Sequence, residues 1–228
     1  MAQNRLTRND IVRAAITFVD VHGLDALTMR RLGQSLGVEA MALYRHVSRR
    51  EDLLEAMVEA LIDSLFDNRL MRQTPSSWED YLQRVANTTK ELALDHLGIF
   101  PLIATQPSQA PWLRPPLRSL RWVEEFLSTL QQFEFSDAAA VGAYKSFTSF
   151  LIGDLLLQVH STNFAITDED DHERSDDDSD LSEYPTVNEL SDLLREDHRR
   201  RQFDDALDEL IERLRLSPPT ATSHSSLS

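Results

Sequence analysis

Apolar residues recur through most of this sequence at intervals of three and four, the spacing that gathers side chains on one face of an α-helix. The first such stripe consists of Ile11, Val12, Ala15, Phe18 and Val19. The apolar residues do not follow the alternating spacing that is typical of half-buried strands. Glycine occurs only six times in 228 residues. This pattern predicts an all-α fold.

Capping residues and glycines divide the pattern into successive helices. Thr7 followed by Asp10, and Ser48 followed by Glu51, match the capping-box spacing. Thr28 is suited to cap a further helix, which Gly37 would end. The expected helices span about residues 8–22, 28–36, 39–46, 51–72, 78–94, 95–105, 115–132, 137–161 and 187–214.

Charge is distributed unevenly along the chain. The formal net charge of −15 argues, taken whole, against a nucleic-acid partner. Residues 1–50, however, carry eight arginines and four acids, whereas residues 168–183 carry ten acids and one base, Arg174. A basic end on an acidic remainder points to nucleic-acid binding at the basic end, although solvated surface charge is the commoner cause of any single charge cluster. The acidic stretch 167–185 and the Pro-, Ser- and Thr-rich tail 217–228 are expected to be disordered.

The sequence lacks the residues that several classes of function require. The absence of cysteine excludes disulfides, thiolate metal sites and a cysteine nucleophile. The sequence contains neither a HExxH motif nor a glycine-rich phosphate loop, and its histidines lack metal-ligand spacing. We therefore predict no enzyme activity, no cofactor and no metal. Because neither a signal peptide nor a membrane span is apparent, we expect a cytoplasmic, nucleoid-associated protein.

Residues 28–46 have the pattern of a helix-turn-helix. A helix ends at Leu36 and Gly37, a tight turn passes through Val38, and a short helix follows. Such a turn lets the second helix project into a DNA major groove, which is about 12 Å wide. The spacing alone fits an ordinary helical hairpin equally well.

The residues themselves are more specific than their spacing. The segment 28–47 reads TMRRLGQSLGVEAMALYRHV and closely resembles the N-terminal domain of TetR-family transcriptional repressors. The resemblance covers about residues 7–60, and LYRHV is its most specific part. It implies a three-helix DNA-binding head at residues 1–50, joined by helix 51–72 to a helical ligand-binding and dimerisation domain at 73–216. It also implies a homodimer, a double-stranded DNA operator and a small-molecule effector.

The resemblance assigns roles to individual residues of the head. It places Arg30 at a base edge, where a guanidinium can pair with guanine, although a solvated surface arginine is the alternative. It places Ala40, Met41 and Ala42 at the base-reading start of the second helix of the motif. Tyr44 and His46 would face phosphates or bases, with packing as the alternative for Tyr44. The expected phosphate contacts of the helix starts are Thr28 and Arg50.

In the larger domain the resemblance implies a dimer interface and a ligand pocket. The helices at 137–161 and 187–214 are expected to form a four-helix bundle with their copies in the partner. The pocket is expected to be lipophilic, with His96, Gln106, Thr148 and Gln158 as polar groups, although aromatic residues at helical spacing also fit an ordinary core. The predicted pocket residues are His96, Phe100, Trp112, Trp122, Phe126, Phe147 and Phe150.

The function predicted from the sequence is that of a ligand-responsive transcriptional regulator acting as a repressor. A dimer would bind a palindromic operator, and a small lipophilic molecule would release it. The alternative is a small-molecule-binding helical protein with weak or no DNA binding.

Overall fold

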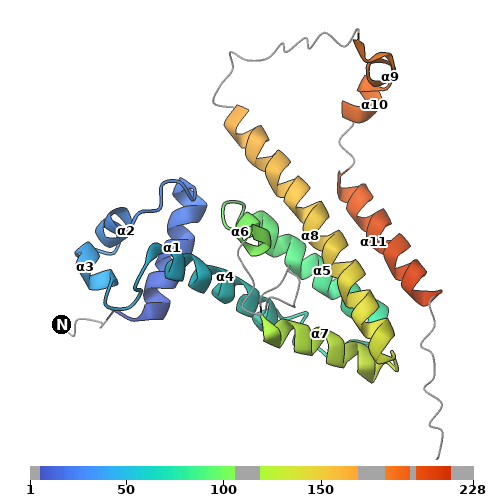
Figure 1. Cartoon of the computed structure of the whole chain (residues 1–228), viewed down its shortest axis with the longest axis horizontal. Helices are drawn as coiled ribbons and strands as arrows, with labels where there is room; N and C mark the ends of the chain where they lie inside the picture. Colours follow the sequence, from blue (N-terminus) through green and yellow to red (C-terminus); the bar gives the residue numbers. More distant parts are fainter. Residues whose placement is uncertain (1–5, 106–118, 169–182, 196–198, 217–228) are drawn as a thin grey trace, which may run out of the picture.

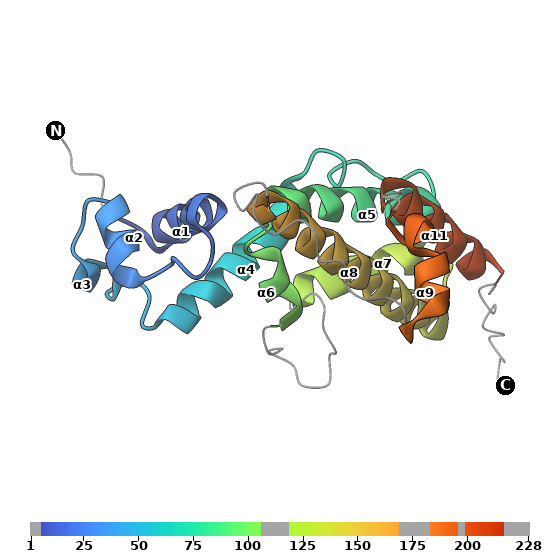
Figure 2. The ribbon, with the colours of Figure 1, turned by 90° about the horizontal axis from the view of Figure 1, so that it is seen from above.

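The structure, a computed structural model, describes residues 6–105, 119–168, 183–195 and 199–216. All regular elements in these ranges are helices, which confirms the predicted all-α class. Two helical units lie at opposite ends of one connecting helix, α4 (Figures 1 and 2). We call the smaller unit the head; it contains α1 (Arg8–His22), α2 (Met29–Ser35) and α3 (Ala40–Leu43).

Local capping explains where the head helices begin. The Thr7 hydroxyl accepts a hydrogen bond from the Asp10 amide, and the Asp10 carboxylate accepts one from the Thr7 amide, so the predicted capping box is confirmed. Thr28 caps α2 by accepting from the Arg31 amide at 3.2 Å. The short helix of the motif is α3, which ends at Leu43, earlier than the predicted His46.

The connecting helix α4 (Arg50–Asp67) carries one long buried stripe. Its first half packs against α1 of the head, and its second half packs against α5 and α6. The predicted capping box at Ser48 is wrong, because the helix begins after Arg49 without a side-chain cap. Asp52, one of the acids of its first turn, pairs instead with the Arg49 guanidinium at 3.0 Å. The helix also ends at Asp67, before the expected residue 72.

The larger unit, which we call the body, is built on one long helix. This helix, α8 (Asp137–Asp168), packs against α5, α6, α7 and α11. None of the described helices is long and apolar enough to cross a membrane. The other body helices are α5 (Trp78–Asp95), α6 (Phe100–Thr105), α7 (Leu120–Gln132), α9 (Pro185–Glu189), α10 (Ser191–Arg195) and α11 (Arg199–Arg215).

Helix boundaries in the body differ from the predicted ones in three places. The helix expected at 95–105 begins only at Phe100, because residues 96–99 form a turn after α5. The helix expected at 187–214 consists of α9, α10 and α11. The long helix α8 continues past the expected end at 161, through positions 167 and 168 of the predicted linker. The rest of that linker up to 182, the start of α7 expected at 115, and the tail lie outside the described residues.

Candidate nucleic-acid interface and ligand site

The helix-turn-helix of the head depends on two glycines with different roles. Gly37 has a φ of 68°, a left-handed conformation that side chains disfavour, and it turns the chain between α2 and α3. Gly33 lies inside α2, where a Cβ atom would come within 2.8 Å of the Val38 carbonyl oxygen. The Gly33 carbonyl also accepts the Val38 amide at 2.9 Å. Gly33 was not among the predicted functional residues, although a glycine inside a predicted helix often marks close packing.

Buried leucines fix the orientation of the two helices. Leu32 of α2 and Leu43 of α3 are fully buried, and Val47 closes the same core. With these side chains turned inward, Met41 of α3 and residues 44–46 of the following turn are exposed. The head therefore presents a short helix whose exposed face is set by its own packing.

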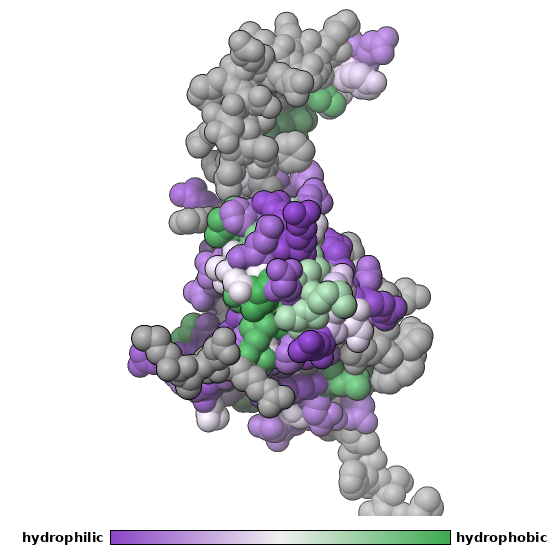
Figure 3. All heavy atoms as spheres, turned by 90° about the vertical axis from the view of Figure 1, so that its left-hand side faces the viewer, coloured by the Kyte–Doolittle hydropathy of each residue, from purple (hydrophilic) through white to green (hydrophobic). Residues whose placement is uncertain are grey.

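The outward face of the motif contains most of the DNA-binding residues predicted from the sequence. Met41 is 73% exposed and Tyr44 is 44% exposed. His46 and Arg30 are also exposed, whereas Ala40 and Ala42 are half-buried. Figure 3, which faces this end of the molecule, shows apolar residues surrounded by hydrophilic ones. A small apolar surface within a hydrophilic surround suits thymine methyl groups in a major groove.

The two neighbouring arginines of α2 differ in their surroundings. Arg31 donates to the Ala26 carbonyl at 3.1 Å, and its guanidinium lies 5.3 Å from the centre of the Phe18 ring. Arg30 makes no such contact with the described part of the chain and is exposed. Arg31 is thus held by the head itself, whereas the guanidinium of Arg30 is free to contact another molecule.

Thr28 and Arg50, the predicted phosphate contacts, both have roles within the head. The Thr28 hydroxyl is the cap of α2. The Arg50 Nε donates to the Leu27 carbonyl at 3.3 Å, which joins the start of α4 to the end of the loop before α2. Both residues therefore lie close together, with the other guanidinium nitrogens of Arg50 left for an anion.

Aromatic side chains gather in the body where the pocket was predicted. Phe126 of α7 lies at the centre, with the rings of Tyr81, Tyr144 and Phe147 at centroid distances of 5.4–5.7 Å. Trp122, one turn before Phe126, packs against Phe66 of α4. We call these six residues the aromatic cluster. Phe100 is buried in α6, Phe150 packs against Phe203 of α11, and Trp112 lies outside the described residues.

The polar groups predicted for the pocket are occupied by other contacts. The Thr148 hydroxyl donates to the Tyr144 carbonyl at 2.6 Å, and the Gln158 amide donates to Asp154 one turn earlier. His96 bonds Asp20, and Gln106 lies outside the described residues. Burial raises the pKa of the Tyr144 phenol to about 12, so this hydroxyl is neutral at physiological pH. No described group of acidic or histidine side chains could hold a metal ion.

One contact joins the body directly to the head. The Nδ1 atom of His96, which caps the end of α5, lies 3.0 Å from a carboxylate oxygen of Asp20 in α1. Next to it, a Cβ atom on Gly98 would come within 3.1 Å of the Val19 side chain. Asp20 was not predicted as a functional residue, because no local sequence signal relates two residues that are 76 positions apart.

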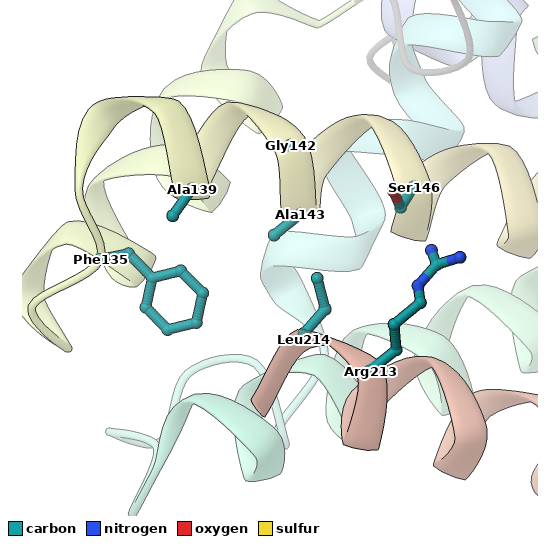
Figure 4. Close-up of a pocket in the computed structure, with 7 residues that line it drawn as sticks. All are labelled: Phe135, Ala139, Gly142, Ala143, Ser146, Arg213 and Leu214. Atoms are coloured by element: carbon teal, nitrogen blue, oxygen red, sulfur yellow. The ribbon is translucent and has the colours of Figure 1, made fainter. Parts of the chain in front are cut away.

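A groove of about 360 Å³ runs between α8 and α11 on the outside of the body (Figure 4). Small residues of α8 form one wall, and Leu214 and Arg213 of α11 form the other. Further along the same side of α8, Gly153 has open space around it and Leu157 is 70% exposed. This face contains the two helices predicted for dimerisation.

Comparison with protein families identifies the chain. Residues 11–57 match the profile described as "Bacterial regulatory proteins, tetR family", and residues 72–216 match "Tetracyclin repressor-like, C-terminal domain". The two matches together cover most of the head, the first half of α4 and the body. The chain belongs to the TetR family of bacterial transcriptional regulators. Members of this family are ligand-responsive repressors rather than enzymes, and they bind operator DNA as homodimers.

Individual relatives support the same assignment. The tetracycline repressor protein class E of Escherichia coli is 31% identical over 160 residues, which are 70% of this chain and 71% of that protein. A crystal structure described as a possible TetR family regulator from Streptomyces coelicolor A3(2) has a TM-score of 0.71 and 25% identity, covering 92% of this chain and all of that one. ActR from Streptomyces coelicolor, solved with actinorhodin, has a TM-score of 0.68 and 22% identity, covering 97% and 100%.

Proposed function

We propose that this protein is a cytoplasmic repressor that binds a palindromic operator as a homodimer and leaves it when a small lipophilic molecule binds the body. The main observation in favour of DNA binding is the exposed face of α2 and α3. On this face the side chains of Arg30, Met41 and Tyr44 are exposed to solvent, while the buried residues of the head hold the two helices in place. Two such heads would meet major-groove faces about 34–36 Å apart, or a multiple of this distance. The division into a head at 1–50 and a body at 73–216 is part of the same proposal.

The head residues divide by chemistry into base contacts and backbone contacts. Arg30 contacts a base edge, while Ala40, Met41 and Ala42 contact thymine methyl groups without side-chain hydrogen bonds. Thr28 and Arg50 contact the DNA backbone and fix the register of the head, and Tyr44 and His46 contact phosphates or base edges. Sequence discrimination by hydrogen bonds therefore rests mainly on Arg30.

A binding experiment with DNA from around the protein's own gene tests the function. Fluorescence anisotropy with fragments upstream of this gene and its neighbours should find one palindrome bound with strong salt dependence. Random DNA of equal length and charge is the control. If no fragment exceeds random DNA at low salt, the protein is instead a small-molecule-binding protein without an operator.

Arg30→Ala is expected to weaken operator binding more than binding to random DNA. The loss of a bidentate contact to guanine should reduce discrimination by about 1–3 kcal/mol, which anisotropy titrations on both DNAs measure. Arg13→Ala removes the same charge from the head, at a residue paired with Asp10, and is the matched control. Equal losses on both DNAs for Arg30→Ala would show that this arginine contacts only phosphate.

For the dimer, we propose that α8 and α11 pack against the same helices of a second copy. The groove of Figure 4 and the exposed Leu157 lie on this face, which is apolar and lined by small residues. A two-fold axis brings identical surfaces together, so side chains of the partner's α8 or α11 would fill the groove. In the family such homodimers are the DNA-binding form.

Coupling between effector and operator needs a path from the body to the head. We place it at α4 and at the contact of His96 with Asp20, because these connect the aromatic cluster and the α5–α6 turn to the head. A ligand that favours another arrangement of the body would move the head through these contacts and lower operator affinity by its differential binding energy.

Asp20→Ala is expected to loosen the head from the body. Loss of a hydrogen bond involving a carboxylate should reduce the stability of the head by about 1–2 kcal/mol, seen as an earlier or separate unfolding transition in circular dichroism melts. Asp25→Ala removes the same charge from the loop after α1 and serves as the control. Identical melts for both variants would contradict a linking role for Asp20.

A further inference from the structure

Met41 is the most exposed sulfur-containing side chain in the described part of the chain. The sequence has five methionines and no cysteine. Met41 is 73% exposed, whereas Met29 and Met57 are 7% and 0% exposed. Met71 is half-buried and packs against the core, and Met1 lies outside the described residues. Among the described methionines, a reagent dissolved in water therefore meets the thioether of Met41 first.

The position of Met41 makes this thioether part of the proposed DNA-contacting surface. Met41 belongs to α3 and lies between Ala40 and Ala42, which are both half-buried. Leucine would supply a similar apolar volume and an equally good helix propensity. Contact with thymine methyl groups alone therefore does not require a sulfur atom at this position.

A thioether differs from an aliphatic side chain in that it can be oxidised reversibly to a sulfoxide. With hypochlorous acid, a sulfur lone pair attacks the chlorine atom, and water then replaces chloride on the sulfur. The products are the sulfoxide, chloride and a proton, so sulfur loses two electrons and chlorine gains them. In the reverse reaction a dithiol supplies two electrons and two protons, the oxygen leaves as water, and methionine sulfoxide reductases catalyse the step.

We propose that Met41 is a site of reversible oxidation by hypohalous acids, and that its sulfoxide lowers the affinity of the head for the operator. This inference rests on the proposed function, because that function places Met41 against DNA bases. The sulfoxide is polar, and a thymine methyl group offers its oxygen no hydrogen-bond donor. The oxidised side chain loses water on binding DNA without gaining a partner, which weakens the complex.

Bound operator determines when Met41 can react. In the proposed complex the side chain lies in the major groove between α3 and the bases, so its thioether is covered. Oxidation then takes place in molecules that have left the operator, and it keeps them off the operator until the sulfoxide is reduced. An oxidant therefore acts in the same direction as the effector, but in the head and not in the body.

Peptide mass spectrometry tests the selectivity of the oxidation. The full chain, treated with a few equivalents of hypochlorous acid, should carry the added oxygen on Met41 before Met29 and Met57. Excess operator should protect Met41, whereas random DNA at the same salt concentration should not. Oxidation of Met71 ahead of Met41, or equal oxidation of Met41 with and without operator, would overturn the proposal.

Anisotropy titrations test the effect of oxidation on DNA binding. The treated protein should bind the operator about tenfold more weakly than the untreated protein. Methionine sulfoxide reductases of both stereospecificities, supplied with dithiothreitol, should restore the affinity, because these enzymes reduce sulfoxides and leave oxidised aromatic residues unchanged. A loss of affinity that the reductases do not reverse would assign the effect to another kind of residue and contradict the proposal.

Two leucine variants assign the effect to one methionine. The measured quantity is the ratio of operator affinity after and before treatment with the oxidant. Met41→Leu should have a ratio near one, whatever its own affinity, and Met71→Leu should keep the tenfold loss of the natural sequence. A tenfold loss in Met41→Leu would show that Met41 is not the sensitive residue.

The same titrations separate this inference from the proposed function. Full operator affinity with Met41 completely oxidised contradicts only the oxidation switch. A lack of operator binding before any treatment contradicts the proposed function, and the switch is then wrong as well. In that case mass spectrometry still decides whether Met41 is oxidised before the other methionines.

Discussion

Replacing Gly33 with valine is expected to abolish operator binding. A Cβ atom at this position would lie 2.8 Å from the Val38 carbonyl oxygen and 3.3 Å from the Ala40 amide nitrogen. Both are backbone atoms, so they cannot swing aside as a flexible side chain can. Valine adds two methyl groups to this clash, and α3 must move away from α2. Overpacking typically costs about 1–3 kcal/mol, and here it also displaces the DNA-contacting helix.

Two measurements separate misplacement of α3 from general unfolding. Operator affinity, measured by anisotropy, should fall by more than about a hundredfold, which corresponds to 2.7 kcal/mol or more. The dimer and the main unfolding transition of the body should persist. Gln34→Val places the same residue one position later, on the exposed side of α2, and controls for the lower helix propensity of valine. Operator binding by Gly33→Val within threefold of the unchanged protein would refute the close-packing argument.

Gly153→Arg is expected to convert the dimer into monomers and thereby to weaken operator binding. Gly153 lies on the outward side of α8, and a Cβ atom there would touch nothing within 4 Å in the single chain. Arginine should therefore leave the monomer intact, and it has a better helix propensity than glycine. In the proposed interface the same side chain would place a charge and a large volume between two helices that approach closely.

Sedimentation velocity measures the oligomeric state of the variant, and DNA titrations measure its operator affinity. The variant should sediment as a monomer with undiminished helix content. Joined binding modules gain about 10²–10⁴ in avidity, so operator affinity should fall by about this range. Gln131→Arg, on an exposed residue at the end of α7, is the control and should remain dimeric. A dimeric Gly153→Arg would place the interface on another face of the body.

Predictions from the sequence succeeded where the cause is local. Thr7 and Thr28 cap their helices through hydrogen bonds that span three residues, and Gly37 turns the chain through its own φ angle. Helical periodicity likewise placed Ile11 and Val19 on one helix face, and both are buried. Such interactions depend on a few neighbouring residues, so their signals are complete in the sequence.

Predictions of helix boundaries and caps failed where the outcome depends on packing against other parts of the chain. The segment after Tyr184 has apolar residues at helical spacing, but Leu193 and Leu194 are exposed in the structure. No surface of the described residues covers these two leucines, and the expected single helix is replaced by α9, α10 and α11. Ser48 matches a capping box, but α4 begins two residues later. Sequence spacing shows that a side chain can cap or pack, and not whether it does.

The candidate ligand site was predictable only in part, for the same reason. Aromatic residues were found from their spacing, and Phe126 and Phe147 lie in one cluster. Which polar atoms remain unpaired depends on contacts between helices distant in the sequence. The bond between His96 and Asp20 was not predicted, and neither was the unpaired Tyr144 hydroxyl.

The apolar face of α3 has a consequence for chemically modified DNA. If Met41 and its alanine neighbours identify thymine by its methyl group, they respond to a methyl group at that place in the major groove, whichever pyrimidine carries it. Cytosine methylated at carbon 5 places a methyl group at the equivalent position. A head of this kind would sense cytosine methylation within its operator, so the methylation state of the DNA would act as a second input beside the effector.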